Sequence, residues 1–222
     1  MSRDLRMGLF QYESPLTLIY QNNLLVLIYS ARENHDFTDF AFVCGGTLFQ
    51  VHKVVVCSQS KVFHTACTGP FEESITNEID LSQFSVNQVK WLVDFLYTGA
   101  YLIPKDSNLD DHIHMFTIGV VYEIEPLAQY AAWQFHCGLS KLLMLEEVLP
   151  LISLVYNSAP EHRQELREEV VKFLRSPGSR IKADMETRGW YDDMAAECPE
   201  FIKDFLFSYL EGSDRDWSFS SN

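Results

Sequence analysis

The feature that most constrains the fold is a pair of β-prone runs separated by two glycines. The runs are Phe40–Cys44 and Thr47–His52, and Gly45-Gly46 stands between them. A two-residue turn between antiparallel strands requires positive φ at both central positions, and glycine adopts this conformation without steric cost. We therefore predict a β-hairpin over residues 40–52.

The rest of the first half mixes helical signals with one more strand signal. Ile79 and Leu81 alternate with acids, which predicts a short strand over 78–81. Ser85 and Gln88 have the form of a capping box, and the helix that it opens is expected to stop at Gly99. Two further helices are expected over 14–31 and over 53–66 with a break near Ser58, and a loop over 68–70.

The second half carries helical signals, and strand signals disappear from Leu139 onward. We expect helices over 115–123, 126–137, 147–156, 160–174 and 199–210. The fold class is therefore α+β: a short mixed sheet flanked by helices, followed by an all-helical extension. The polar end, residues 213–222, is expected to be disordered.

The expected helix over 14–31 has apolar residues on more than one side. Leu24 and Leu27 share one side, whereas Leu25, Val26 and Tyr29 lie elsewhere around the helix. A helix on the surface of a monomer needs only one apolar stripe. Two interpretations remain open: a second polypeptide covers the helix, or it is a central core helix of its own chain.

The net charge and the length of the apolar runs exclude two kinds of partner. With 17 basic and 31 acidic residues the chain carries −14 at pH 7. Such a chain is repelled by nucleic acid and by acidic membrane surfaces, so we expect neither as a direct partner. The continuous apolar stretch Leu24–Tyr29 is far shorter than the ~20 residues that a membrane-spanning helix needs.

The cysteines and histidines give no sign of enzymatic chemistry. Five cysteines without CxxC spacing indicate reduced thiols and a cytoplasmic or nuclear protein. His112 and His114 beside two aspartates suggest a metal site, but we expect a surface loop there because a third convergent ligand is not evident. Cys57, His64 and Cys67 are interpreted as core residues. The sequence also contains no phosphate-binding or nucleophile motif, so we predict no catalytic residue, no metal, no cofactor and no enzyme activity.

Several segments, in order along the chain, together resemble a BTB/POZ domain. Residues 39–46 and 49–53, with Ser60 and Phe63, resemble its opening, and residues 79–81 and 96–101 look like its third strand and its Tyr-Thr-Gly signature. Residues 122–127 also fit, although the family more often has Ala-Asp-x-Tyr where this chain has Gly-Val-Val-Tyr at 119–122. The remainder looks like the helical extension of stand-alone BTB proteins of filamentous fungi.

The resemblance implies four parts and a dimer. The parts are an amino-terminal segment with an apolar interface helix (1–36), the BTB/POZ-like domain (37–137), the helical extension (138–212) and a tail (213–222). In dimeric members the amino-terminal helix packs on the partner subunit, and an opposite-charge pair lies near the two-fold axis. The dimer-interface residues expected on this basis are Leu24, Leu25, Leu27, Ile28, Asp39 and Lys53. For Asp39 and Lys53 an ordinary local salt bridge is the alternative.

The resemblance also implies a second interaction surface. Phe71-Glu72-Glu73 matches the hydrophobic-x-Glu element with which ubiquitin-ligase adaptors of this family contact a cullin scaffold. We therefore expect Phe71, Glu73 and Tyr97 to bind a cullin-type partner, with a plain solvated loop as the alternative. His52 matches a family histidine that we interpret as structural.

These observations predict a protein-interaction module that homodimerises. The expected role is an adaptor in a cullin–RING ubiquitin ligase, with a cullin scaffold and an unknown protein substrate as partners. The alternative is a BTB scaffold or transcriptional co-regulator that binds no DNA directly, since the chain has no zinc-finger pattern.

Overall fold

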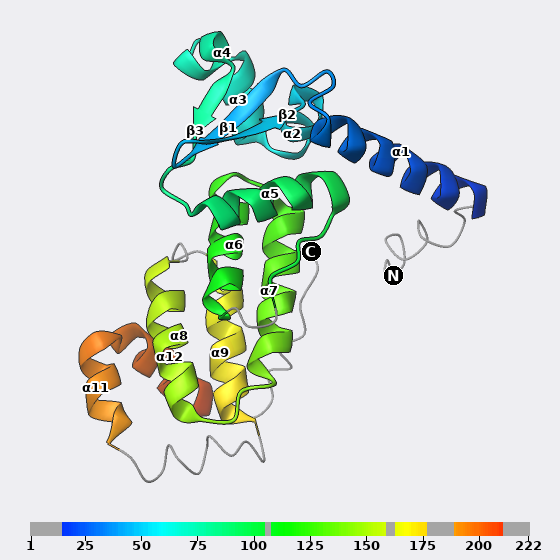
Figure 1. Ribbon diagram of the computed structural model, residues 1–222. Helices are drawn as coiled ribbons and strands as arrows, with labels where there is room; N and C mark the ends of the chain where they lie inside the picture. The colour runs from blue at the N-terminus through cyan, green and yellow to red at the C-terminus, as the bar shows by residue number, and fades with distance from the viewer. Residues whose placement is uncertain (1–14, 105–107, 159–162, 177–188, 211–222) are drawn as a thin grey trace, which may run out of the picture. The chain divides into compact units, whose positions relative to one another are not determined.

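The computed structural model describes residues 15–104, 108–158, 163–176 and 189–210, with side chains from Leu24 onward except those of Tyr191 and Asp193 (Figure 1). The chain divides into two compact units, residues 1–102 (unit 1) and 103–222 (unit 2). The tail expected over 213–222 lies outside the described residues. Within the described part of the chain, no helix is both long enough and apolar enough to cross a membrane.

Unit 1 is built around a three-stranded mixed sheet. The strands are β1 (Phe40–Cys44), β2 (Thr47–Val51) and β3 (Glu78–Asp80), in the order β2-β1-β3. β1 pairs antiparallel with β2 and parallel with β3. Gly45 and Gly46 have φ values of 55° and 80°, which confirms the predicted hairpin and its reason.

In the described part of unit 1, five helices accompany the sheet. They are α1 (Pro15–Glu33), α2 (Lys53–Gln59), α3 (Lys61–Thr68), α4 (Glu72–Thr76) and α5 (Val86–Thr98). The predicted break falls at Ser60, whose extended backbone separates α2 from α3 and whose side chain accepts the Phe63 N–H. Phe71-Glu72-Glu73 is not a loop, because Glu72 and Glu73 form the first turn of α4. The alternative that this segment is merely solvated stays open.

The predicted boundaries of α5 are confirmed by its caps. The Ser85 side chain accepts the Gln88 N–H, and the Gln88 side chain accepts the Ser85 N–H, which completes the capping box. At the other end Gly99 takes φ 73°, a conformation that glycine adopts without strain.

The core of unit 1 lies between the sheet and its helices. Phe42 at the centre of β1 is fully buried, and its ring centroid is 4.9 Å from that of Phe63 on α3. Val51, Val56 and Leu81 are also fully buried. Each fully buried side chain of this size contributes about 1.5–3 kcal/mol, so this core fixes the sheet and the α2–α3 pair together.

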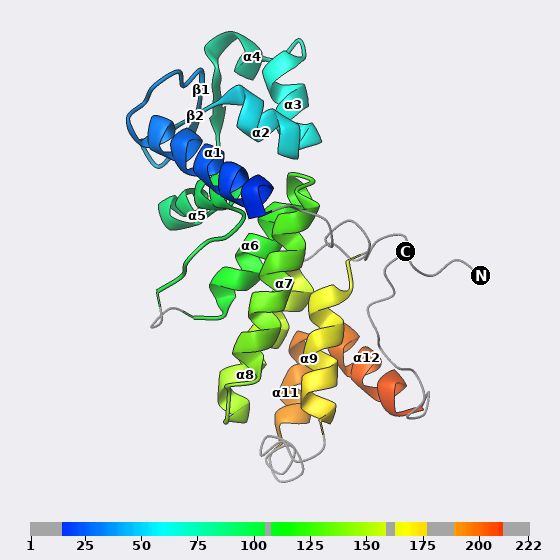
Figure 2. The same ribbon diagram turned by 90° about the vertical axis from the view of Figure 1, so that its right-hand side faces the viewer.

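Unit 2 is helical in its described part. Its helices are α6 (Asp110–Val121), α7 (Glu125–Leu139), α8 (Leu145–Ser158), α9 (Glu165–Arg175), α11 (Trp190–Glu197) and α12 (Pro199–Leu210). α6 and α7 lie side by side (Figures 1 and 2), and a Cβ at Gly119 would come within 2.6 Å of the Ala128 backbone N, so glycine permits their close approach. The sequence missed α11, and it placed His112 and His114 in a loop although both belong to α6.

A buried arginine connects three helices of unit 2. The Arg167 guanidinium of α9 donates to the Tyr156 carbonyl of α8 at 3.2 Å and to Glu200 of α12 at 3.4 Å. It also lies 4.6 Å from the centroid of the Tyr156 ring, and the Tyr156 hydroxyl donates to Asp204 of α12 at 2.8 Å. Charge-assisted bonds of this kind are strong and directional, so they fix the register of α8, α9 and α12.

The α5 capping box gives a stability prediction. Ser85→Ala should lower the free energy of unfolding by about 1 kcal/mol, because two backbone N–H groups at the helix start lose the reciprocal bonds. Urea denaturation followed by circular dichroism measures the change. Ser58→Ala is the control, since the exposed Ser58 hydroxyl only bonds the Val55 carbonyl within α2. An equal loss in both variants would contradict the assignment.

Candidate protein-interaction surfaces

The first candidate surface is the apolar run Leu24–Leu27 of α1. Leu24, Leu25, Val26 and Leu27 are 58%, 48%, 65% and 65% exposed, and Ile28 is half-buried. Figure 1 shows the amino-terminal half of α1 extending beyond the rest of unit 1, and the apolar run begins at the middle of this helix. Exposed apolar side chains in such a run make it a candidate interaction site, because a single copy of the chain leaves them in contact with water.

The carboxyl-terminal half of α1 is anchored on α5. The rings of Tyr29 and Tyr97 meet edge to face at 6.3 Å, and the Tyr29 hydroxyl donates to Asp94 at 3.4 Å. The Arg32 guanidinium lies 5.4 Å from the Tyr29 ring centroid and 5.6 Å from that of Tyr97. Aromatic and cation–π contacts of this kind hold the helix in one direction. The apolar run Leu24–Leu27 therefore lies directly before the anchored residues Tyr29 and Arg32.

Asp39 and Lys53 lie close together but make no ion pair with each other among the described contacts. The Lys53 backbone N–H donates to the Asp39 carboxylate at 2.7 Å, so the carboxylate caps the start of α2. The Lys53 ammonium donates instead to the Asn77 side-chain oxygen at 2.5 Å and lies 5.7 Å from the Phe40 ring centroid. The alternative of a simple salt bridge between the two side chains is not formed.

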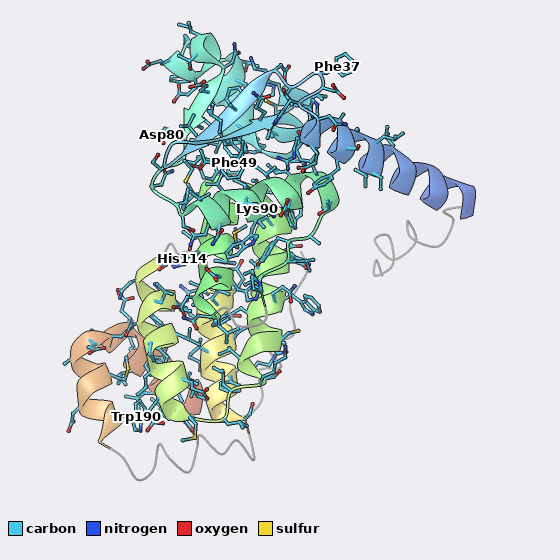
Figure 3. All side chains as sticks on the ribbon, viewed as in Figure 1. Phe37, Phe49, Asp80, Lys90, His114 and Trp190 are labelled. Carbon is cyan, nitrogen blue, oxygen red and sulfur yellow. The ribbon has the colours of Figure 1, made fainter. Side chains whose placement is uncertain are left out.

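Two exposed apolar residues that lie close in sequence to Asp39 and Lys53 were missed by the sequence analysis. Phe37 is 91% exposed, and Figure 3 shows it pointing away from the rest of unit 1. Val54 on α2 is 76% exposed. The sequence signal for Phe37 is an isolated aromatic between Asn34 and Asp39 in an otherwise polar stretch.

The second candidate surface is formed by Phe71, Glu73 and Ile75 at α4, and we name it the Phe71 surface. Phe71 is 49% exposed and Ile75, which the sequence analysis missed, is 83% exposed. The Phe71 ring lies directly over Gly69, where an added Cβ would be 2.7 Å from the ring. Glu73 is half-buried, and its carbonyl accepts the N–H of Asn77, which ends α4 in the left-handed conformation.

Tyr97 differs from the prediction that it contacts a partner, because its side chain is only 2% exposed. Its hydroxyl accepts the His52 backbone N–H at 2.8 Å and lies 2.8 Å from His52 Nδ1. His52 Nε2 lies 2.9 Å from the Asp36 carbonyl, which can only accept, so Nε2 carries the proton and Nδ1 accepts from the Tyr97 hydroxyl. Burial raises the pKa of Tyr97, which keeps this donor neutral. We therefore assign Tyr97 to the interior of unit 1, together with the structural His52.

The residues considered for metal or thiol chemistry are spread over different environments. His112 and His114 are half-buried on α6, and the described residues include no group of three or more His, Cys, Asp or Glu side chains arranged to hold a metal. Cys67 is buried as predicted, whereas Cys57 is half-buried and His64 is exposed. The prediction that all three belong to the core is correct for Cys67 alone.

The comparison with known families identifies the first part of the chain. Residues 28–131 match the BTB/POZ domain model, and the predicted fold class, a short mixed sheet flanked by helices with a helical remainder, is confirmed. BTB/POZ domains are protein-interaction modules. The match begins at Ile28, directly after the exposed run of α1. The domain boundaries at 36/37 and 137/138 remain predictions.

The curated relatives are similar over less than half of this chain. Human Kelch-like protein 28 is 27% identical over 92 residues, which cover 41% of this chain and 16% of that protein. Kelch-like protein 21 of Danio rerio is 31% identical over 85 residues, covering 38% and 14%, and mouse TD and POZ domain-containing protein 3 is 31% identical over 67 residues, covering 30% and 18%. The chain thus spans less than a fifth of the length of these relatives.

Two solved structures are also similar to the chain. The BTB domain of zebrafish PATZ1 has a TM-score of 0.44 and 17% identity, and the BTB domain of human gigaxonin has a TM-score of 0.42 and 20% identity. Each match covers 55% of this chain and 93% of the solved chain.

The fungal origin, the cytoplasmic or nuclear location and the absence of enzyme activity remain predictions.

His112 gives a prediction about the pH dependence of stability. Burial, followed by the charge of Lys141, lowers the pKa of His112 from 6.5 to about 4 in the folded chain. The unfolded chain therefore takes up this proton first as the pH falls from 6.5 to 4, and the free energy of unfolding falls with it. After allowance for partial exposure, the loss is about 1–3 kcal/mol.

The measurement is urea denaturation of the wild type and of His112→Gln between pH 7 and pH 4. The variant should lose less stability than the wild type across this interval, because it has no imidazole to protonate. His112→Asn is a second variant that removes the same titration in a different shape. Parallel curves for the wild type and both variants would show that His112 is not the group responsible.

Proposed function

We propose that the chain is a self-associating protein-interaction subunit that acts as an adaptor in a cullin–RING ubiquitin ligase. The observation that supports self-association is the exposure of four consecutive apolar side chains on α1, Leu24–Leu27. Phe37 and Val54 add exposed apolar surface to the same unit. The resemblance to dimeric BTB/POZ proteins supports a second copy of this chain as the occupant of the surface.

Burial of the α1 run would contribute favourably to a dimer. Burying one exposed Leu side chain contributes about 1.5–3 kcal/mol, and a two-fold dimer buries every residue of the run twice. Leu24 and Leu27 therefore contribute enough, in both subunits together, to offset much of the entropy lost on association. Their exposure in the single chain means that an acidic replacement disturbs the dimer and not the fold of the subunit.

A double substitution at this surface tests the dimer. Leu24→Asp combined with Leu27→Asp should raise the dissociation constant at least about 100-fold, because apolar contacts are lost and four carboxylates are brought into the interface. Analytical ultracentrifugation over a concentration series gives the constant. The matched control is Leu206→Asp with Leu210→Asp, two residues of α12 that are 48% and 79% exposed. Equal effects of the two double variants would overturn the assignment to α1.

The adaptor role is supported by the Phe71 surface. Phe71 is half exposed, Ile75 follows it four residues later, and the acidic Glu72 and Glu73 stand between them. An aromatic anchor surrounded by charge is a typical hot spot, in which the ring supplies affinity and the charges supply specificity and steering. The hydrophobic-x-Glu element of family adaptors matches the same residues.

Binding to a cullin amino-terminal region tests the adaptor role. Phe71→Ala should weaken binding at least about 30-fold, since loss of a hot-spot aromatic costs about 2 kcal/mol or more. Isothermal titration calorimetry gives the dissociation constant, and Phe207→Ala is the control because Phe207 is 48% exposed, close to the 49% of Phe71. Absence of binding by the wild type would exclude the adaptor role and leave a scaffold or co-regulator that binds other proteins.

A further inference from the structure

Two cysteines of unit 1 meet at the packing contact between α2 and α3. The Cys57 thiol of α2 donates to the Phe63 carbonyl of α3 at 3.7 Å. In an α-helix each carbonyl accepts the N–H four residues later, so the Phe63 carbonyl faces the backbone N–H of Cys67. The Cys57 sulfur therefore lies beside the helical turn that contains Cys67. The Cys57 thiol is also among the groups that raise the pKa of the Cys67 thiol, which agrees with the closeness of the two side chains.

The two thiols differ in their access to solvent. Cys67 is 6% exposed, whereas Cys57 is half-buried. Burial is the largest cause that raises the pKa of Cys67 to about 12, followed by its hydrogen bond with Cys57 and the charge of that residue. The Cys67 sulfur therefore keeps its proton at neutral pH, and Cys57 is the thiol that a small oxidant reaches first.

We propose that Cys57 and Cys67 are a redox-active dithiol that a hydroperoxide converts to an intramolecular disulfide. In the first step the Cys57 thiolate attacks one oxygen of hydrogen peroxide. An S–O bond forms, the O–O bond breaks, and the departing hydroxide takes up the proton released by Cys57 to become water. Cys57 is oxidised to the sulfenic acid and the peroxide is reduced.

In the second step the Cys67 sulfur attacks the Cys57 sulfur. An S–S bond forms, the S–O bond breaks, and the oxygen leaves as a second water with the Cys67 proton. Two thiols and one hydrogen peroxide thus give one disulfide and two waters. The disulfide would join α2 to the last turn of α3, and reduction by a dithiol would reverse it.

The other cysteines provide internal comparisons for this pair. Cys44 is buried and donates to the Phe84 carbonyl at 3.2 Å, and Cys198 is also buried. Cys137 on α7 is half-buried like Cys57 and serves as the control for solvent access alone. The proposal depends on neither the α1 surface nor the Phe71 surface.

The test treats the reduced 222-residue chain with one to a few equivalents of hydrogen peroxide, blocks the remaining thiols, and digests it with trypsin without reduction. Lys61 lies between the two cysteines, so cleavage there separates them unless a disulfide joins their peptides. The expected result is a linked Cys57–Cys67 peptide pair, loss of two free thiols per chain, and recovery of both thiols after dithiothreitol.

Variants separate the two steps. Cys67→Ser should abolish the disulfide and leave a Cys57 sulfenic acid that dimedone labels several-fold more than it labels the wild type. Cys57→Ser should abolish both products, and Cys137→Ser should leave both unchanged. Thermal unfolding by circular dichroism confirms that each variant is folded. Equal labelling of Cys57 and Cys137 without a linked peptide pair, or linkage of Cys57 to a second chain, would overturn the proposal.

Discussion

The contact between α1 and α5 is the interaction on which the rest of the account depends. Tyr29, Arg32 and Tyr97 form a cluster of two rings and one guanidinium that fixes the carboxyl-terminal half of α1. The Tyr97 side chain is itself held in place, because its hydroxyl is hydrogen-bonded to His52. Because this end of the helix is fixed in this way, the apolar run Leu24–Leu27 that precedes it is exposed to solvent and not folded back on its own unit.

In this chain Tyr97 and Gly99 of the Tyr-Thr-Gly signature stabilise the structure of unit 1 itself. Tyr97 is buried and bonded to His52, and its neighbour Gly99 ends α5 with a positive φ. The motif thus supports the α1 anchor and the end of α5. The surface that we propose for a partner instead contains two exposed side chains, Phe71 at the N-cap of α4 and Ile75 within α4.

The features that the sequence predicted correctly are those set by local chemistry. Gly45-Gly46 defines the hairpin, and Ser85, Gln88 and Gly99 define the ends of α5, because each acts on backbone groups within a few residues. The short α4 was missed because Asn77, which ends it, gives only a weak stop signal. Exposure was harder to predict: only the folded chain shows that Phe37 is outside and Tyr97 inside, since both are aromatics next to polar residues.

Light scattering on the unmodified chain at micromolar concentration measures most directly whether the α1 run is covered by another copy. If it is, the molar mass should be twice the 25.7 kDa of one chain and should fall toward 25.7 kDa only on strong dilution. A mass of 25.7 kDa throughout the micromolar range would contradict the account, because the exposed leucines would then have no second copy to cover them.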